Sequence, residues 1–328
     1  MKKDFYKAVF KRIASSILVL LLLVTFIFFL VRLAPGDPAQ KFLSPQLSPQ
    51  LAEKVTKSFG LDQPIHLQYF SFVANLFSGD FGISYNYRQP VFTVVKDYFL
   101  FTLIFSTISF IIQLLLGYLL AKHTFSNEGK LVDRLFSKIS IILFSVPTFV
   151  IGLILVYIFS VKLDLLPTSG IKSIFYDDLG PIEKLRDYFI HLILPMITLS
   201  LAGVAVFYKY LRDNFDSIKN NPFIINLRAN GISEKEIFNK HLVPNAIQPL
   251  ISIAGIEFGI LLGGALLTEV IFSLPGMGRL TVSAILNRDF PLVIACSFIA
   301  GLMMIISNLA ADLIKIKMDK RFIKELIN

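Results

Sequence analysis

Two glutamates stand inside an otherwise apolar stretch of the chain and are the first candidates for chemistry. Glu257 and Glu269 lie within residues 250–274, a run long enough to cross a lipid bilayer. Ionisable side chains at that depth usually face a cavity, a transport path or a partner charge. At roughly 100° per residue, Glu257 points about 200° away from Gly255, whereas Glu269 falls within about 40° of Gly255. The two carboxylates are therefore not a pair.

Glu257 is a candidate for the wall of a transport path, where its carboxylate would attract a cationic group. The alternative is a structural hydrogen bond between subunits. Gly255, Gly259 and Gly263 recur every four residues nearby and form a stripe that lets another helix approach closely. Gly263, at the end of this stripe, is the second candidate path residue.

Residues typical of metal, nucleotide or covalent sites do not occur at workable spacing. The four histidines (His66, His123, His191 and His241) are scattered, and no two have helical metal-ligand spacing. The single cysteine, Cys296, permits neither an intrachain disulfide nor a thiolate cluster. No Gly-x-x-x-x-Gly-Lys-Ser/Thr loop occurs, so any nucleotide that drives this protein must be bound by another chain. We expect no metal, no cofactor and no enzymatic activity of its own.

The composition requires an apolar solvent around the protein. Of the 328 residues, 55% are hydrophobic and only 17% are charged, and the mean hydropathy is +0.68. A soluble protein of this length has too little interior for so much apolar surface, whereas a bilayer can accommodate it. We therefore expect an all-α integral membrane protein that crosses the cell membrane several times.

Six stretches are apolar and long enough to cross the membrane as helices, which takes roughly 20 residues each. We expect these six transmembrane helices at residues 13–31, 98–121, 139–161, 192–208, 250–274 and 291–311. Basic residues precede the first stretch, as in a signal peptide. Its 19 apolar residues exceed a typical signal-peptide core, so we interpret it as a retained anchor.

The distribution of basic residues predicts the topology. If the N-terminus is cytoplasmic, the inner segments contain 20 of the 32 Lys and Arg residues, although the outer segments are longer. The positive-inside rule then places both termini in the cytoplasm. The same distribution accounts for the net charge of +9, so nucleic acid is not needed as a partner, while attraction to anionic lipid remains open.

The outer segment after the first span contains two predicted surface helices. A turn at residues 35–38 is followed by a helix from Ser48 to Gly60 and by a second helix after Pro64. The second helix places its apolar residues on one face: Leu67, Phe70, Ala74 and Phe77. We interpret both helices as a cap that lies on the membrane surface. The alternative is a platform for an extracytoplasmic partner.

The cytoplasmic segment 212–249 has dense helix signals but is too polar to cross the membrane. Asn221 and Pro222 supply an N-cap and a first helical residue. The helix over residues 222–230 then ends at Gly231, which suits the left-handed position after a helix.

A second short helix follows the glycine turn. Ser233 and Glu236 form a capping box that starts it, and we expect it to end before Pro244. The two helices carry six apolar residues into the cytosol: Ile224, Ile225, Leu227, Ile237, Phe238 and Leu242. These residues predict docking of a partner or packing against the chain's own helices, and spacing does not separate the two. Tethering to membrane spans at both ends argues against a DNA-binding helix-turn-helix.

The order of these motifs resembles the membrane permease subunits of ABC importers in the dipeptide, oligopeptide and nickel group. The similarity covers nearly the whole chain, and nine short motifs carry it. They are Pro35-Gly36-Asp37-Pro38, Gly60-Leu61-Asp62-Gln63-Pro64, Gly79-Asp80-Phe81-Gly82, Pro147-Thr148-Phe149, Arg228-Ala229-Asn230-Gly231, His241 to Pro249, Glu269, Pro275-Gly276-Met277-Gly278 and Arg288-Asp289-Phe290-Pro291.

The resemblance implies a type I ABC importer permease and gives the segment 212–249 a role. This coupling segment would insert into a groove on a cytosolic ATPase. The residues carried over for it are Arg228, Ala229, Asn230, Gly231, Ser233, Glu236, His241 and Pro244. Asn230 stands where the family commonly has lysine.

The resemblance also implies a division of the chain and a set of partners. An anchor at 1–31 and an outer segment at 32–97 precede a five-span permease core at 98–314 and a cytoplasmic tail at 315–328. The partners would be a second homologous permease, two cytosolic ATP-binding subunits and an extracytoplasmic substrate-binding protein.

The expected function is ATP-coupled import of nickel, a metal chelate, or di- and oligopeptides. The alternatives are a secondary transporter driven by an ion gradient and an intramembrane enzyme. Neither internal repeats nor a charge relay supports the secondary transporter, and no Ser/His, Asp/Asp or metal motif within the spans supports the enzyme.

Overall fold

The computed structural model describes residues 2–33 and 63–318, and this part of the chain is built from helices. The predicted turn at residues 35–38 and the predicted helix over 48–60 lie outside the described residues. The α-helices are α1 (Lys2–Leu33), α3 (Ile65–Ser78), α4 (Val91–Ser126), α5 (Leu131–Ser145), α6 (Thr148–Leu155), α7 (Pro181–Lys219), α8 (Pro222–Ala229), α9 (Glu234–Glu236), α10 (Val243–Leu262), α11 (Leu266–Ile271), α12 (Met277–Leu286) and α13 (Phe290–Met318). Three short helices of other types are η2 (Val156–Lys162), η3 (Tyr176–Asp178) and η4 (Ile237–Leu242).

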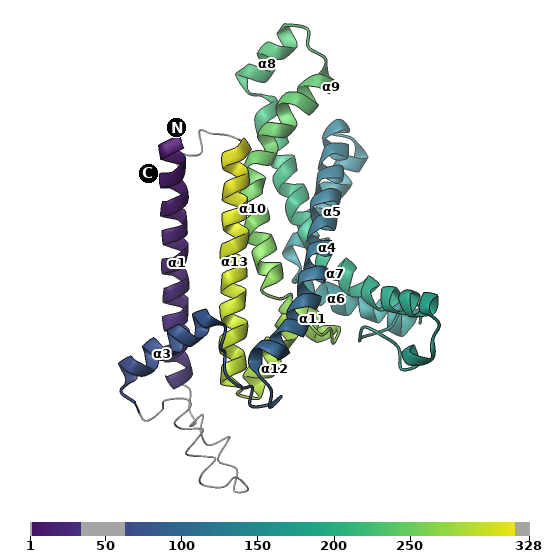
Figure 1. The fold of residues 1–328 in the computed structure, drawn as a ribbon. Helices are drawn as coiled ribbons and strands as arrows, with labels where there is room; N and C mark the ends of the chain where they lie inside the picture. The colour runs from purple at the N-terminus through teal and green to yellow at the C-terminus, as the bar shows by residue number, and fades with distance from the viewer. Residues whose placement is uncertain (1, 34–62, 319–328) are drawn as a thin grey trace.

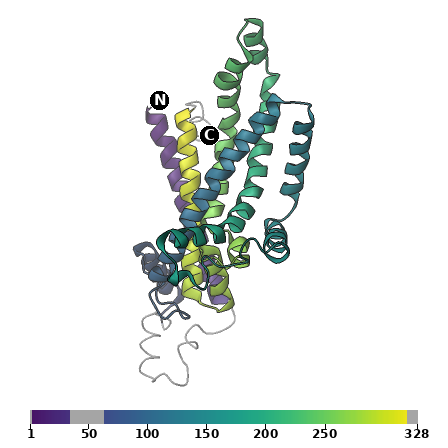
Figure 2. The same cartoon turned by 90° about the vertical axis from the view of Figure 1, so that its right-hand side faces the viewer.

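The long helices run side by side and form the membrane-spanning body (Figure 1). Among the described residues, five helices are long and apolar enough to cross a membrane, and a bent pair of helices brings the number to six. The predicted all-helical membrane fold is therefore confirmed. The start of α1, the end of α13 and the α8–α9 pair all lie at the same end of the body (Figures 1 and 2).

The third predicted span is not one straight helix. The chain breaks between α5 and α6, and the axes on either side of the break meet at 104°. Pro147 causes the break, because a residue before proline is forced out of the helical region, and Val146 has φ −87° and ψ 127°. The upright part of this span is therefore 131–145, and residues 148–162 turn to the side (Figure 1).

The surface helix α3 forms as predicted and also packs on the body. The apolar face predicted to lie on the membrane surface, which includes Leu67, Phe70 and Phe77, is exposed, whereas Leu76 is buried. Leu76, Phe72 and Val73 pack against α1 and α13, and the Tyr69 hydroxyl is 2.7 Å from Thr25 Oγ1 on α1. Both faces of α3 are apolar, so contact with α1 decides which one is covered.

Helix α1 is joined to the rest of the body mainly through α13. Leu20 and Val24 of α1 pack beside Phe298, and the Arg12 guanidinium forms an ion pair of 2.5 Å with Asp312 toward the end of α13. The carboxylate of Asp312 thus has a fixed cationic partner from another helix. A carboxylate at this depth is better stabilised by a fixed cation than by water alone.

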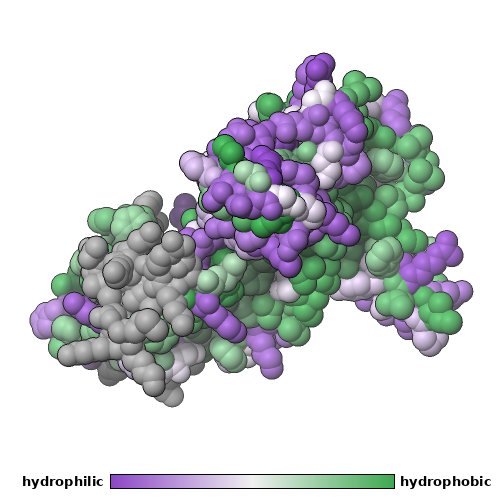
Figure 3. Space-filling model, turned by 90° about the horizontal axis from the view of Figure 1, so that it is seen from above, coloured by the Kyte–Doolittle hydropathy of each residue, from purple (hydrophilic) through white to green (hydrophobic). Residues whose placement is uncertain are grey.

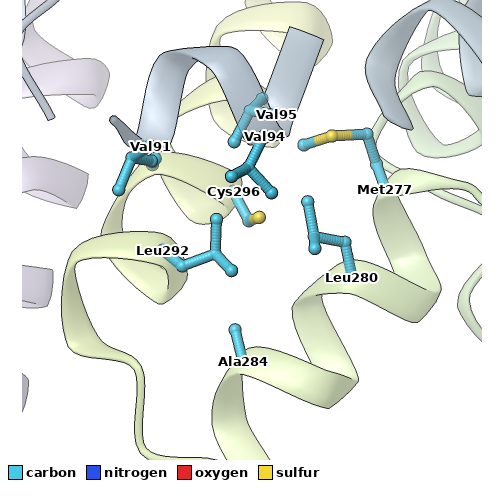
Figure 4. Packing of buried hydrophobic residues seen from close by; sticks show 9 residues of the cluster. Val91, Val94, Val95, Met277, Leu280, Ala284, Leu292 and Cys296 are labelled. Atoms are coloured by element: carbon cyan, nitrogen blue, oxygen red, sulfur yellow. The ribbon is translucent and has the colours of Figure 1, made fainter. Parts of the chain in front are cut away.

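A tight core lies at the opposite end of the body, where the start of α4 meets α12 and α13 (Figure 4). Nine buried residues form it: Val91, Val94, Val95, Met277, Leu280, Ala284, Leu292, Ala295 and Cys296. The small residues among them let three helices approach closely. This core fixes the short helix α12 against the membrane-spanning helices.

Candidate functional site

The α8–α9 pair projects beyond the ends of α7 and α10 and forms a knob, defined here as residues 220–242 (Figures 1 and 2). Its turn is built as the sequence predicts. Gly231 has φ +77°, a left-handed conformation that glycine adopts without strain. The Glu236 amide donates a hydrogen bond of 3.3 Å to Ser233 Oγ, so Ser233 caps α9.

The second knob helix does not end before Pro244, contrary to the prediction. It continues through the π-helical turn η4 into α10, and Pro244 lies in the first turn of α10. A π turn makes i→i+5 hydrogen bonds in place of the i→i+4 bonds of an α-helix. The backbone hydrogen-bond pattern therefore shifts by one residue just ahead of Pro244, which has no N–H group to donate. The knob is therefore continuous with the membrane-spanning helix α10.

Polar contacts within the knob fix its shape. Arg228 donates to the Glu234 carboxylate at 2.6 Å and 3.2 Å and to the carbonyl of Lys219 at 3.2 Å. The Asn230 amide donates to the carbonyl of Asn226 at 2.9 Å. Ala229, Asn230 and Gly231 are exposed at the tip. Arg228 therefore braces the knob, and the three residues after it form its free end.

His241 lies at the base of the knob, in η4. It is half-buried, and its carbonyl accepts a hydrogen bond of 2.6 Å from the side chain of Asn245 in α10. This places His241 at the junction between the knob and the membrane-spanning helix, away from the free tip.

The apolar residues of the knob divide into two groups. Ile224, Ile237 and Leu242 are buried within the chain, so for them packing against the chain's own helices is the observed arrangement. Phe223 and Ile225 remain 43% and 54% exposed. Seen from this end, the knob is mainly hydrophilic with a few apolar residues on it, and the sides of the body below are hydrophobic (Figure 3).

Helix α10 presents two different faces. A Cβ added at Gly255 would lie 2.5 Å from Ala311 Cβ, and one at Gly263 would lie 3.4 Å from Ala300 Cβ, so the glycine stripe packs on α13. Glu257 lies away from that contact. It is half-buried beside the exposed Ile256 and Ile260. The structure thus places Gly263 in a helix contact and Glu257 on a separate, partly open face.

Comparison with known proteins identifies this arrangement. Residues 113–324 match the family described as the binding-protein-dependent transport system inner membrane component, and residues 5–106 match its N-terminal companion model. The chain belongs to this family. It is a multi-pass permease component of the cell membrane, and the predicted family resemblance is confirmed.

Relatives of this permease align over almost their whole length. The dipeptide transport system permease protein of Lactococcus lactis is 33% identical over 96% of this chain and 98% of the relative. The glutathione transport system permease protein of Salmonella typhimurium is 33% identical over 93% of this chain and 95% of the relative. A probable peptide ABC transporter permease protein of Sinorhizobium fredii is 32% identical over 95% and 98%, respectively.

Glu269 of the permease has a role that the sequence did not reveal. Its side chain is 0% exposed and accepts hydrogen bonds from Gly278 N–H at 2.6 Å, Arg279 N–H at 3.1 Å and Thr102 Oγ1 at 3.1 Å. Thr102 in turn accepts a hydrogen bond of 2.8 Å from the Met277 amide. Glu269 therefore caps the N-terminus of α12 and ties it to α4, an arrangement that the helix dipole also favours.

Glycines make room for this carboxylate. A Cβ at Gly276 would lie 2.3 Å from Glu269 Cδ, and one at Gly264 would lie 2.4 Å from the Gly278 nitrogen. Gly264 also has φ +111°, in the break between α10 and α11. The signal in the sequence was the run from Pro275 to Gly278 ahead of a short apolar helix, but the partner carboxylate could not be assigned without the fold.

A second buried carboxylate holds the loop between α3 and α4 of the permease. Asp289 is 0% exposed and accepts hydrogen bonds from Ser84 Oγ at 2.5 Å and from the Asn86 amide at 3.0 Å. The nearby Tyr87 and Tyr98 hydroxyls are 3.2 Å apart, and burial raises the pKa of Tyr87 to about 12. The loop between α3 and α4 is thus fastened to the corner between α12 and α13.

A cavity of about 390 Å³ opens between α4 and α7. It is mostly apolar and aromatic, and it is lined by Asp97, Leu100, Phe101, Ile104, Phe105, Ile108, Tyr188, Leu192, Met196 and Pro275. Among the described residues, no group of three or more His, Cys, Asp or Glu side chains could hold a metal ion.

Proposed function

We propose that this permease is the membrane-spanning subunit of an ATP-driven importer of di- and oligopeptides. The observation that carries the proposal is the knob, which stands clear of the membrane-spanning body at the end where α1 begins and α13 ends (Figure 1). A permease without its own nucleotide site needs such a rigid contact for the subunit that hydrolyses ATP. Phe223 and Ile225 supply exposed apolar anchors for it.

The proposed topology places the knob and both termini in the cytoplasm. Residues 212–249 then form the coupling segment, in which Arg228, Ser233 and Glu236 fix the fold and Ala229 to Gly231 present the tip. Two cytosolic ATPases would close on binding ATP and draw two such knobs together, one from this permease and one from a homologous second permease. The pair would then open outward to a substrate-binding protein, and hydrolysis would reset it.

Peptide is the cargo that the relatives favour. Those described above are named for dipeptide, glutathione and peptide transport. The mostly apolar cavity between α4 and α7 also suits side chains of varied shape better than a bare metal ion. Nickel or a metal chelate, the other cargo expected from the sequence, becomes an outcome of the test.

The test is uptake by cells with and without this gene. Labelled dipeptide and radioactive nickel are supplied separately, each with the other as a competitor, and ion gradients are collapsed while ATP is maintained. We expect loss of dipeptide uptake on deletion and persistence of uptake in the complemented strain without ion gradients. If deletion abolished nickel uptake but not dipeptide uptake, the cargo would be nickel rather than peptide. If uptake depended on the ion gradient, a secondary transporter would be favoured instead.

Glu257 is proposed to line the path and to attract cationic groups of the cargo. Replacing it with glutamine keeps the shape and removes the charge, so uptake of a lysine-containing dipeptide should fall about tenfold relative to a neutral dipeptide. Competition between the two peptides in the Glu257→Gln strain measures this ratio. An unchanged ratio would remove Glu257 from the path and leave it a structural role.

A further inference from the structure

Three aromatic rings from three different helices meet at the base of the knob. Phe238 of η4 lies 5.6 Å from Phe125 of α4 and 5.4 Å from Phe215 of α7, measured between ring centroids. Phe125 and Phe215 are 5.3 Å apart. Such centroid distances are typical of attractive aromatic pairs. Phe238 is thus the side chain through which the knob contacts both α4 and α7 in this cluster.

Cations cover the cluster. The Arg212 guanidinium lies 5.4 Å from the centre of the Phe125 ring, and Lys122 Nζ lies 5.8 Å from the centre of the Phe238 ring. Arg212 is only 7% exposed, and a cation over an aromatic face is held more strongly where water is excluded. The rings and the cations therefore form one unit.

Acidic residues from α7 itself, from α5 and from the turn before α5 surround Arg212. Its guanidinium is 2.5 Å from Asp216, 3.5 Å from Asp133 and 3.9 Å from Glu128. Lys219 also pairs with Glu128 and with Asp216. Asp133 lies in the first turn of α5, and Glu128 lies between α4 and α5. The unit around Phe238 thus extends from the knob through α7 to α5.

A displacement of the knob has two routes into the membrane. One route is the backbone, because η4 continues into α10 and residues 220 and 221 join the knob to the end of α7. The other is sideways, through Phe238 into α4 and through Arg212 into α5. A knob attached by its backbone alone would pull on α7 and α10, whereas a knob that is also packed against α4 moves α4 and α5 with it.

We propose that Phe238, packed against Phe125 and Phe215 with Arg212 over the Phe125 ring, is the joint that transmits movement of the knob to α4 and α5. The joint rests on the proposed function, because only an ATPase docked on the knob would move it. Phe238 is a positioning residue that contacts neither the cargo nor nucleotide. Its loss should therefore reduce the number of cargo molecules moved per ATP and leave hydrolysis itself in place.

The test uses the complete importer in proteoliposomes, with ATP hydrolysis and peptide uptake measured on the same vesicles. Phe238→Leu keeps the side chain apolar and removes the ring. We expect uptake per ATP to fall about fivefold or more, the lower end of typical coupling between sites. Phe298→Leu is the matched control, because Phe298 is 7% exposed and contacts the rings of Phe77 and Phe81 far from the knob. It should leave the ratio unchanged.

A double substitution separates a joint from ordinary packing. Once Phe238→Leu has broken the joint, adding Phe125→Leu should lower the ratio little further, because both residues act in one unit. If Phe298→Leu lowered uptake per ATP as much as Phe238→Leu does, the proposed joint would be refuted. An unchanged uptake per ATP in Phe238→Leu would refute it as well. If the unsubstituted importer showed no ATP-driven uptake, the proposed function would be refuted, and the proposed joint with it.

A distance measurement tests the joint without altering it. Lys235→Cys on the knob and Leu131→Cys at the start of α5 place spin labels at two exposed positions, while the native Cys296 is buried. If the joint holds, the distance between the labels stays the same with and without ATP, since knob and α5 move together. A change of about one helical turn, roughly 5.4 Å, would show that they move separately and would overturn the proposal.

Discussion

Replacing Glu269 with glutamine should destabilise the permease by about 3 kcal/mol, because a carboxylate that accepts three hydrogen bonds would become an amide. Its NH₂ group would face the N–H groups of Gly278 and Arg279 or the Thr102 hydroxyl. Buried donors left without an acceptor cost about 1–3 kcal/mol each. The start of α12 would then separate from α4, and uptake would fall along with stability.

Thermal unfolding of the purified permease in detergent measures this effect. The single cysteine, Cys296, is 1% exposed in the core beside α12, so a thiol-reactive dye reports the loss of that packing. We expect the midpoint for Glu269→Gln to fall by about 6 °C or more. Glu257→Gln is the control with the same chemical change in the same span, and it should leave the midpoint in place. Equal midpoints for both variants would contradict the role assigned to Glu269.

The two glutamates illustrate how far the sequence could be interpreted. Helical periodicity predicted correctly that the glycine stripe is a packing face. The angle predicted between Glu269 and Gly255 does not apply, because the helix breaks at Gly264 and Glu269 belongs to the separate helix α11. Periodicity could not reveal the partners of Glu269, because Thr102 is 167 residues away along the chain and the amides of α12 come close only through the break at Gly264. Contacts of this kind depend on how helices are placed, which local patterns do not encode.

The other features that the sequence did not predict also depend on how the helices are placed. The third span breaks at Pro147, but the angle of 104° depends on how α6 packs against α7 and α11. Helix α3 is apolar on both sides, so its periodicity predicts a helix but not that Leu76 is buried against α1 and α13. Turn signals, in contrast, act over a few residues, and Gly231 and Ser233 behave as predicted.

Replacing Gly231 with aspartate should abolish peptide uptake while the permease still folds. Gly231 has φ +77°, and nothing lies within 4 Å of an added Cβ, so the cost to folding is limited to backbone strain of about 1 kcal/mol. Asparagine and aspartate tolerate this conformation better than other side chains do. The effect of aspartate therefore comes from the charge that it places at the exposed tip.

Gly231→Asn is the matched control, since it has nearly the same shape and the same backbone tolerance but no charge. If the tip inserts into a groove on an ATPase, burying an unpaired carboxylate there should weaken docking by several kcal/mol, a loss of more than tenfold in uptake. The asparagine variant should retain most of its uptake. Binding of the purified ATPase to vesicles that carry each permease variant measures docking directly. Normal docking and uptake by Gly231→Asp would show that the tip stays in solvent, and the coupling role of residues 212–249 would then be refuted.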